Sequence, residues 1–363
     1  MKNSLCILIL LHLIVSALFS QREDHLVFEG EEGPGKGKHV VFLSGDEEYR
    51  SEECLPMMAQ ILAKQGFKCT VLFSIDEATG IVNPMNQASL SHPEALDTAD
   101  ALVMALRFRN WNDETMIRFE KALSRGIPIA ALRTSTHAFK FPKDSKWAKY
   151  SFNAKPGTGW AKGFGREILG ESWAGHHGRH RFEGTRSFIE ESNKAHAILK
   201  GVGTIFGTTD VYGAKPDMKM ATVLLRGQVT KTLESDSPAV EGKKNNPMQP
   251  IAWTREYEFS KGKKNRIFTT TMGAATDLSD ANLRRLVLNS VYWGLSLPVP
   301  GTMDVSLPGV YEPTMYKAGA HRKGLKPKDF ICQPLKGETA GWNLKIKEGS
   351  RIALLGNGLG SRM

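Results

Sequence analysis

The sequence contains little cysteine and no paired-cysteine motif. Three of its 4 cysteines, Cys54, Cys69 and Cys332, lie beyond the N-terminal apolar run, and none of them forms a CxxC motif. An odd number of cysteines without such spacing provides neither a disulfide framework nor a zinc knuckle. The composition therefore excludes a fold that depends on cross-links or on cysteine-bound zinc.

The chain also lacks internal repeats of solenoid length and basic blocks interleaved with aromatic residues. Its 48 Lys and Arg and 38 Asp and Glu give a net charge of +10, but the two signs are mixed along the chain. Such mixing is typical of a solvated surface and not of a nucleic-acid interface. We therefore expect no nucleic-acid partner. The oligomeric state stays open.

The longest apolar run stands at the beginning of the chain. Lys2 precedes the apolar residues 5–19, and the polar, charged residues 21–24 follow them. This pattern is typical of a secretory signal peptide, and the run is short for a membrane span of about 20 residues. We expect residues 1–20 to be a cleaved signal peptide, which predicts a periplasmic or secreted protein with no stable membrane span. An uncleaved anchor is the alternative.

Short apolar runs alternate with helical patterns after residue 38. The runs expected to form parallel strands are His39–Leu43, Cys69–Phe73, Asp100–Leu106 and Ile127–Leu132. Two helices are expected between these runs, one from a cap at Ser51 to Gln65 and one from a cap at Asp113 to Arg125. Later strands are expected at 221–225, 250–257 and 266–272, and a last helix is expected to begin after a cap at Asp280. This alternation predicts an α/β fold with a parallel sheet and helices on both faces.

The composition also suggests boundaries along the chain. We expect a linker over residues 21–38, a single domain over residues 39–297, and a tail or linker rich in Pro, Gly and Lys over residues 298–349. Residues 350–363 combine a strand pattern with a glycine turn and then stop, so we expect the start of a further domain whose deletion leaves the melting temperature of the core unchanged.

Several sequence blocks, taken in order, resemble the ThuA-like (trehalose-utilisation-like) family. They are FLSGDEEYR at 42–50, GIPIAALR at 126–133, GESWAGHH at 170–177, HAILKG at 196–201, TDVY at 209–212, PIAWTREY at 250–257 and RIFTTTMG at 266–273. The resemblance implies a flavodoxin-like sheet of the class I glutamine amidotransferase kind and a role connected with sugars. In amidotransferases the turn after the fourth strand presents a cysteine nucleophile. Here that turn contains no cysteine, so we expect no glutaminase activity.

Candidate site residues follow from the geometry of such sheets, because ligands bind at the carboxyl ends of the strands. The candidates for catalysis are His137, His176 and Asp46. The candidates for ligand binding are Glu47, Tyr49, Arg107, Arg133, His177, Asp210, Tyr212, Trp253 and Arg255. Rings such as Trp253 offer an apolar face to a sugar, while charged groups can bind its hydroxyls. Trp253 could equally be a core residue of an alternating strand.

A histidine-rich stretch, WAGHHGRHR at 173–181, interrupts the regular pattern. Its imidazoles, His176, His177 and His180, could hold a divalent metal together with Asp46, Glu47 or Asp210. The spacing matches no established zinc motif, so direct hydrogen bonding to a ligand is the preferred interpretation and the cofactor stays unknown. A solvated basic loop is the simplest alternative.

These features predict an exported protein with a carbohydrate-related pocket that acts in trehalose or glycoside utilisation. Its expected partner is a small-molecule or carbohydrate ligand. The alternative is a non-catalytic sugar-binding or interaction module attached to a downstream enzyme. The missing cysteine favours binding and the histidine-rich stretch favours catalysis, so the sequence does not choose between them.

Overall fold

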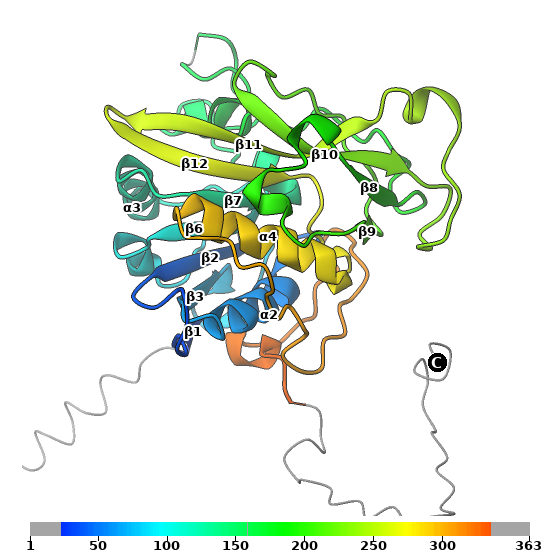
Figure 1. The fold of residues 1–363 in the computed structure, drawn as a ribbon. Coiled ribbons are helices and arrows are strands. Elements are labelled where there is room, and N and C mark those ends of the chain that lie inside the picture. Colours follow the sequence, from blue (N-terminus) through cyan, green and yellow to red (C-terminus); the bar gives the residue numbers. More distant parts are fainter. Residues whose placement is uncertain (1–22, 158, 335–363) are drawn as a thin grey trace, which may run out of the picture.

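A computed structural model describes residues 23–157 and 159–334 of the chain (Figure 1). One ten-stranded sheet runs through the molecule, in the strand order β1-β3-β2-β6-β7-β12-β11-β10-β8-β9. The signal peptide expected at residues 1–20 and the further domain expected at residues 350–363 lie outside the described residues.

Five neighbouring strands are parallel, and they include the four strands predicted to lie side by side. They are β3 (Lys68–Phe73), β2 (His39–Gly45), β6 (Ala101–Leu106), β7 (Ile129–Leu132) and β12 (Lys263–Thr270). Numbered along the chain, these strands have the order 2-1-3-4-5 of flavodoxin-like folds. The strand order reverses between β2 and β6, and open α/β sheets bind ligands at such a point.

Antiparallel strands extend the sheet at both edges. At one edge β1 (His25–Phe28) pairs with β3, and beyond β12 follow β11 (Gln249–Ser260), β10 (Ala221–Val229), β8 (Thr185–Ile189) and β9 (Phe206–Gly207). The three later strands expected from the sequence are therefore present. Two short strands, β4 (Ile75–Asp76) and β5 (Ile81–Val82), form a separate pair.

Helices cover both faces of the parallel strands, as predicted. Helices α2 (Ser51–Ala63) and α4 (Ala281–Gly294) pack on one face, and α3 (Asp113–Ser124) packs on the other (Figure 1). In β2, Val40 and Phe42 belong to the first layer of the core, whereas Val41 and Leu43 belong to the second. Successive side chains of a strand point to opposite faces, so a strand buried on both sides is apolar throughout.

Two of the three predicted helix caps differ by one residue. Ser51 is the first residue of α2, and its hydroxyl contacts Ser44 and accepts from the Asp46 N–H, while Arg50 takes the cap position. Asn112, and not Asp113, caps α3 by accepting from the Thr115 N–H. Asp280 caps α4 as predicted. Neighbouring polar residues compete for a cap, and the backbone geometry decides between them.

Regular structure begins earlier than predicted, because β1 lies inside the expected linker at residues 21–38. All four residues of β1 pair with β3. The glycine-rich stretch after β1 packs tightly, since a Cβ atom at Gly30 would lie 2.2 Å from the carbonyl oxygen of Gly66. The glycines of this stretch therefore allow close packing against the turn that follows α2.

The described part of the predicted tail, residues 298–334, packs against the core instead of extending from it. Val299, Met303, Val305, Phe330 and Cys332 are buried in the layer formed by α2 and α4. The segment contains one short helix, Pro327–Phe330. The linker interpretation was wrong for these residues, because apolar side chains spaced irregularly along the segment make long-range contacts that a composition rich in Pro and Gly conceals.

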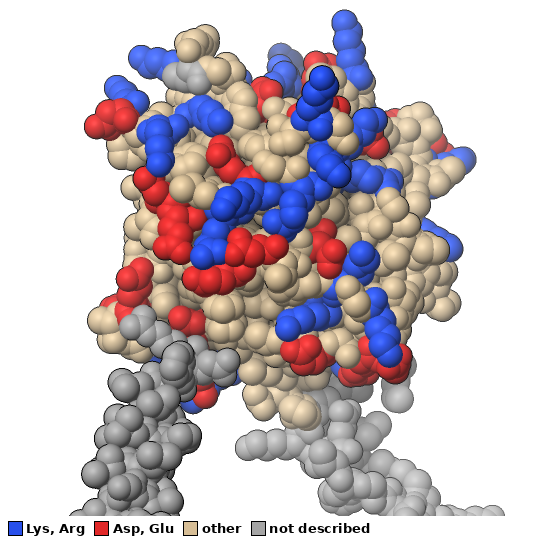
Figure 2. All heavy atoms as spheres, turned by 90° about the vertical axis from the view of Figure 1, so that its left-hand side faces the viewer, with Lys and Arg blue, Asp and Glu red and all other residues tan. Residues whose placement is uncertain are grey.

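Basic and acidic side chains lie next to one another on the face drawn in Figure 2. The ion pairs at the surface include Arg118 with Glu114 and Lys264 with Glu256. Such exposed pairs contribute little to stability, because water and salt screen them. Within the described residues, no helix is both long enough and apolar enough to cross a membrane.

Candidate functional site

Three loops meet at the carboxyl ends of the central strands. Asp46, Glu47 and Tyr49 follow β2, Arg107 follows β6, and β7 runs directly into a short helix, Arg133–His137. Arg133 and His137 thus lie at the carboxyl end of a central strand, where the sequence leads us to expect site residues. The loops occupy the point where the strand order reverses, which is the expected ligand position of the fold.

Asp46 organises the loop after β2. One carboxylate oxygen accepts from the backbone N–H groups of Glu48 and Tyr49 at 2.8 and 3.0 Å, and the other accepts from the Thr134 hydroxyl. The residue is buried, with 1% of its surface exposed. Since both oxygens are bonded within the chain, these contacts favour a positioning role for Asp46 over the catalytic role expected from the sequence.

Glu47 is buried between two arginines. Arg107 and Arg109 donate to its two carboxylate oxygens at 3.0 and 3.1 Å. Burial and the neighbouring Asp46 raise the pKa of Glu47 despite these cations, and burial lowers the pKa of Arg109 to about 10. The three side chains join the loops after β2 and β6 into one unit, in which Arg107 is the partly exposed member.

Arg133 lies at the centre of the site and is fully buried. Its guanidinium lies over the rings of Tyr49 and Tyr212, 4.6 and 3.8 Å from their centroids. It donates to the carbonyl oxygens of Asp210 and Thr271 at 2.7 and 2.8 Å. Its backbone has a φ of 43°, a conformation that residues other than glycine rarely adopt. The backbone of Arg133 thus forms the sharp turn after β7, and its side chain bonds this turn to Asp210.

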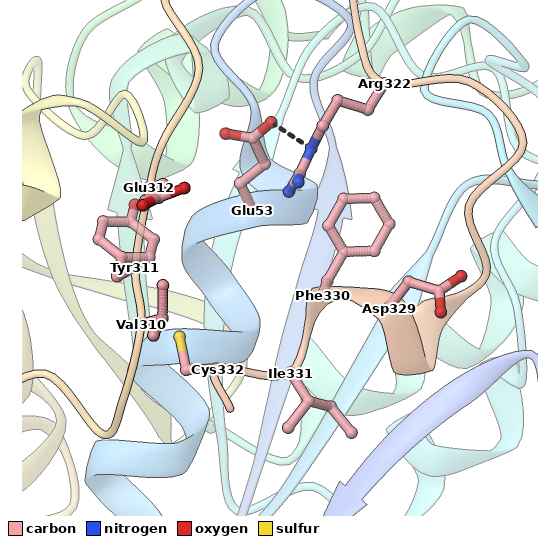
Figure 3. Close-up of a pocket in the computed structure, with 9 residues that line it drawn as sticks. All are labelled: Glu53, Val310, Tyr311, Glu312, Arg322, Asp329, Phe330, Ile331 and Cys332. Carbon is pink, nitrogen blue, oxygen red and sulfur yellow. Dashed lines mark ion pairs between the residues drawn. The ribbon is translucent and has the colours of Figure 1, made fainter. Parts of the chain in front are cut away.

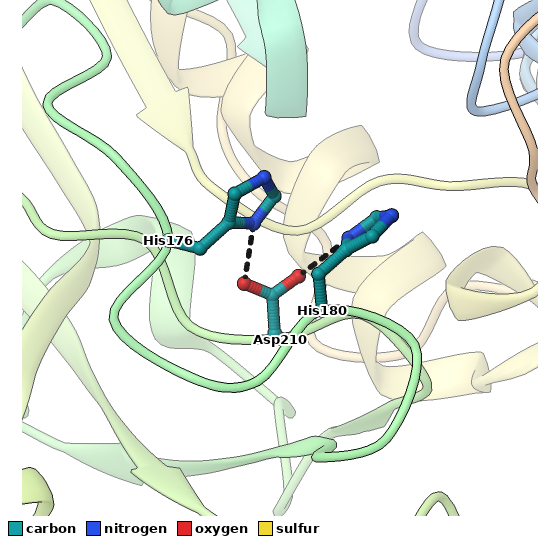
Figure 4. Close-up of side chains that lie close together, drawn as sticks. All are labelled: His176, His180 and Asp210. Atoms are coloured by element: carbon teal, nitrogen blue, oxygen red, sulfur yellow. Dashed lines mark hydrogen bonds and ion pairs between the residues drawn. The ribbon is translucent and has the colours of Figure 1, made fainter.

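Asp210 accepts hydrogen bonds from three cationic or imidazole groups. The Arg133 guanidinium lies 2.9 Å from Oδ1, His176 Nδ1 lies 2.7 Å from Oδ2, and His180 Nδ1 lies 3.2 Å from Oδ1. Figure 4 shows the two imidazoles on either side of the carboxylate. The second ring nitrogen of His180 faces Glu48 at 3.1 Å. A buried carboxylate therefore anchors two partly exposed imidazoles.

These contacts shift the pKa values of the cluster in opposite directions. Burial opposes ionisation of Asp210, but Arg133 and the two imidazoles hold the pKa of this carboxyl well below its usual range. Hydrogen bonds to Asp210 and Glu48 raise the pKa of His180 to about 9. The Asp210 carboxylate is therefore ionised at neutral pH, and it stabilises a proton on His180.

His137 lies near His176 but in a different environment. Its ring is 5.2 Å from Trp173 and 6.3 Å from Tyr212, and the ring of His176 contacts the same two aromatics at 5.8 and 5.4 Å. The two histidines therefore lie on the same side of the molecule. Burial lowers the pKa of His137 well below its usual value, so this imidazole is neutral.

Three sequence candidates point away from this cluster. His177 Nε2 bonds to the carbonyl oxygen of Lys244 at 2.8 Å. Trp253 is fully buried and donates to the carbonyl oxygen of Leu169, as expected for the core alternative. Arg255 donates to a backbone carbonyl oxygen at 3.0 Å beside Tyr257. None of these side chains contacts Asp210 or its two histidine partners in the described residues.

Two residues that the sequence did not single out complete the cluster. Glu48 reaches His180, although it stands between two residues that were named as candidates. Tyr316 comes from the segment after α4, and its ring lies 5.0 Å from Tyr49 and 5.5 Å from His180. Local patterns carry no signal for Tyr316, because its position depends on how the segment 298–334 folds back.

A separate pocket lies between α2 and the C-terminal segment. It has a volume of about 130 Å³, and its walls include Glu53, Tyr311, Arg322 and Phe330. Figure 3 shows the ion pair between Glu53 and Arg322, whose charged atoms lie 3.2 Å apart. No predicted site residue lines this pocket. We place the functional site at the Asp210 cluster, because the candidates Tyr49, Arg133, His176 and Tyr212 meet there.

The Asp210 cluster also has the composition of a metal site. One ligand atom each from His176, His180 and Asp210 lies within 4.8 Å of the other two. Imidazole nitrogens with a carboxylate oxygen are ligands that zinc and similar ions accept. The metal interpretation of the histidine-rich stretch therefore retains His176 and His180 but not His177, which points elsewhere.

The fold and site together define a flavodoxin-like α/β protein with a polar site at the strand-order reversal. Residues 39–294 match the family model of ThuA, described as trehalose utilisation, and the chain belongs to this family. Membership supports a general role in carbohydrate utilisation.

Solved structures with a similar arrangement include two ThuA-like proteins. The one from Parabacteroides merdae is 16% identical, with a TM-score of 0.46, over 78% of this chain and 98% of the other. The one from Bacteroides uniformis is 13% identical, with a TM-score of 0.44, over 73% and 94%. A comparison with curated proteins finds no match.

Proposed function

We propose that this protein binds a carbohydrate ligand at the Asp210 cluster and acts on it in carbohydrate utilisation. The observation that carries the proposal is the pair formed by His176 and Asp210. The carboxylate is buried, whereas the side chain of His176 is 35% exposed and is anchored to it at 2.7 Å. The second nitrogen of His176 points away from Asp210 (Figure 4), where a ligand hydroxyl can reach it.

Aromatic rings beside His176 support a sugar as the ligand. Trp173 lies 5.8 Å from the imidazole and Tyr212 lies 5.4 Å from it. A sugar offers C–H groups that pack on such rings. Trp173 therefore takes the stacking role that the sequence suggested for Trp253.

The same pair supplies chemistry that does not need a cysteine. A carboxylate bonded to one imidazole nitrogen orients the ring, so the other nitrogen faces a ligand and can give or take a proton. We propose that His176 performs this transfer, that Asp210 orients it and that Arg133 holds Asp210 in place. The neutral imidazole of His137 packs next to Trp173, with the ring centroids 5.2 Å apart.

Calorimetric titration with disaccharides, beginning with trehalose and in the presence of a chelator, tests the proposal. His176→Ala should weaken binding at least tenfold, because it removes the exposed polar group. His177→Ala is the matched control, since this neighbour faces Lys244 and should bind as the wild type does. Equal affinities in the two variants, or no binding of any disaccharide by the wild type, would contradict the proposal.

We further propose that the protein is exported, on the basis of the charged start, apolar run and polar boundary within residues 1–24. N-terminal sequencing of the protein recovered from its native compartment should find residues 1–20 removed. An intact N-terminus on the mature protein would contradict this.

A further inference from the structure

We propose that His176, His180 and Asp210 bind one divalent transition-metal ion of the zinc type. Their ligand atoms converge within 4.8 Å, and two of the three come from one loop, four residues apart. The set combines two imidazole nitrogens with one carboxylate oxygen. Three protein ligands of this kind leave a coordination position for water or a substrate oxygen, as in catalytic zinc sites.

The distances suit an ion after small adjustments. Zinc ligands lie about 2.0–2.2 Å from the metal, so two of them are about 3–3.5 Å apart. Here His176 Nδ1 and His180 Nδ1 lie 2.7 and 3.2 Å from the oxygens of Asp210. These distances run to different oxygens, and the three ligand atoms lie within 4.8 Å of one another, so the side chains would have to rotate by up to about 1 Å to surround an ion. The ion would replace the protons that now bridge nitrogen and oxygen.

Residues behind the three ligands support the same interpretation. The second nitrogen of His180 bonds to the Glu48 carboxylate at 3.1 Å, and metal-bound histidines commonly make such a bond. Arg133 holds Oδ1 of Asp210 at 2.9 Å, which orients Oδ2 toward His176. Glu48 also supplies a negative charge that offsets the nearby guanidinium. The outer contacts therefore orient two of the three ligands.

An ion from solution can reach the cluster. The side chains of His176 and His180 are 35% and 27% exposed, whereas Asp210 forms the buried base. A metal at this position would polarise a bound water or sugar hydroxyl and would replace the proton transfer proposed for His176, because a ring bound through Nδ1 can only donate from its second nitrogen. This inference therefore concerns the same site as the proposed carbohydrate function. Metal binding does not require a sugar, so the two proposals can fail separately.

The test is calorimetry with ZnCl₂ on the full chain, without a histidine tag, after chelator treatment and without any sugar. We expect one ion per chain, at least tenfold weaker binding in His176→Ala and in His180→Ala, and wild-type affinity in His177→Ala. Mg²⁺ should not bind at the same concentrations, because imidazole is a poor ligand for it. All variants would carry His25→Ala and His92→Ala, since these rings stack at 4.0 Å and could bind zinc themselves.

Thermal melting of each variant confirms that it is folded. His176→Ala is the decisive variant if His180→Ala does not fold, because His176 is the more exposed ligand. The proposal is overturned if zinc does not bind, if it binds equally to the wild type and His176→Ala, or if Mg²⁺ binds as tightly. Because the sugar titrations contain a chelator, their result does not depend on whether the protein binds zinc.

Discussion

The guanidinium of Arg133 donates to Asp210 at 2.9 Å, and the two side chains are 1% and 0% exposed. The pair joins the turn after β7 to a segment that lies 77 positions later in the chain. Two buried charges stabilise each other only while both are present, since either one alone has lost its hydration without compensation. The pair is therefore a structural centre of the site as well as the support for His176.

Asp210→Asn should lower the free energy of unfolding by about 3–5 kcal/mol, because it leaves Arg133 buried without its counter-charge. Urea denaturation followed by fluorescence measures this loss. Glu256→Gln is the control, since its ion pair with Lys264 lies at the surface and its removal should change the stability far less. Similar losses in the two variants would show that the buried pair contributes no more than a surface pair.

Glu52 should make stability fall as the pH rises. Its carboxylate is buried without a hydrogen-bond partner in the described residues, and burial raises its pKa from 4.5 to about 8. Between these values the folded chain holds a proton that the unfolded chain releases, so the free energy of unfolding decreases by up to about 1.4 kcal/mol per pH unit. The contribution is constant below pH 4.5 and above pH 8.

Glu52→Gln should remove this slope, which makes the variant progressively more stable than the wild type from pH 5 to pH 8. Urea titrations at four pH values measure the difference between the two proteins. Glu256→Gln, at the surface, should keep the wild-type slope. Parallel curves for the wild type and Glu52→Gln would mean that Glu52 is ionised in the folded protein.

Cys54 and Cys69 should be unreactive in the folded protein, because both are buried and burial raises the pKa of each thiol. We expect the thiol reagent DTNB to label them at least 100-fold more slowly than in the unfolded chain. Cys54→Ser should keep any ligand affinity, and glutamine hydrolysis should be undetectable. Rapid labelling, or loss of binding by a folded Cys54→Ser protein, would indicate a functional thiol.

Tyr316 should anchor the C-terminal segment to the site. Its ring is fully buried against Tyr49 and His180, and its hydroxyl donates to the carbonyl oxygen of Thr208 at 2.8 Å. Tyr316→Phe should cost about 1 kcal/mol for the hydrogen bond. Tyr316→Ala should cost about 3–5 kcal/mol for the cavity.

The adjacent Met315, 40% exposed, provides the control, and Met315→Ala should be nearly neutral. Unfolding by urea compares the three variants with the wild type. If Tyr316→Ala is as stable as Met315→Ala, the segment does not contribute to the core.

The sequence predicted the central architecture because its evidence is local. Runs such as residues 39–43 and 127–132 are apolar at every position, which indicates strands buried on both faces. Helical patterns between them require crossovers, and crossovers make the strands parallel. The same reasoning placed the Arg133–His137 turn at the end of a central strand and identified it as free of cysteine.

Only the tertiary structure decided how the polar residues combine. His176 and His177 are neighbours in one loop, yet the first reaches Asp210 and the second reaches Lys244. Trp253 was a candidate for the site and is a core residue, whereas Tyr316, from a segment taken for a linker, lies against His180. A strand or helix follows from periodicity within a few residues. A site is made by contacts between residues far apart in the chain, such as His180 and Asp210, which are 30 positions apart, and Tyr49 and Tyr212, which are 163 apart. Their geometry depends on the packing of the whole chain.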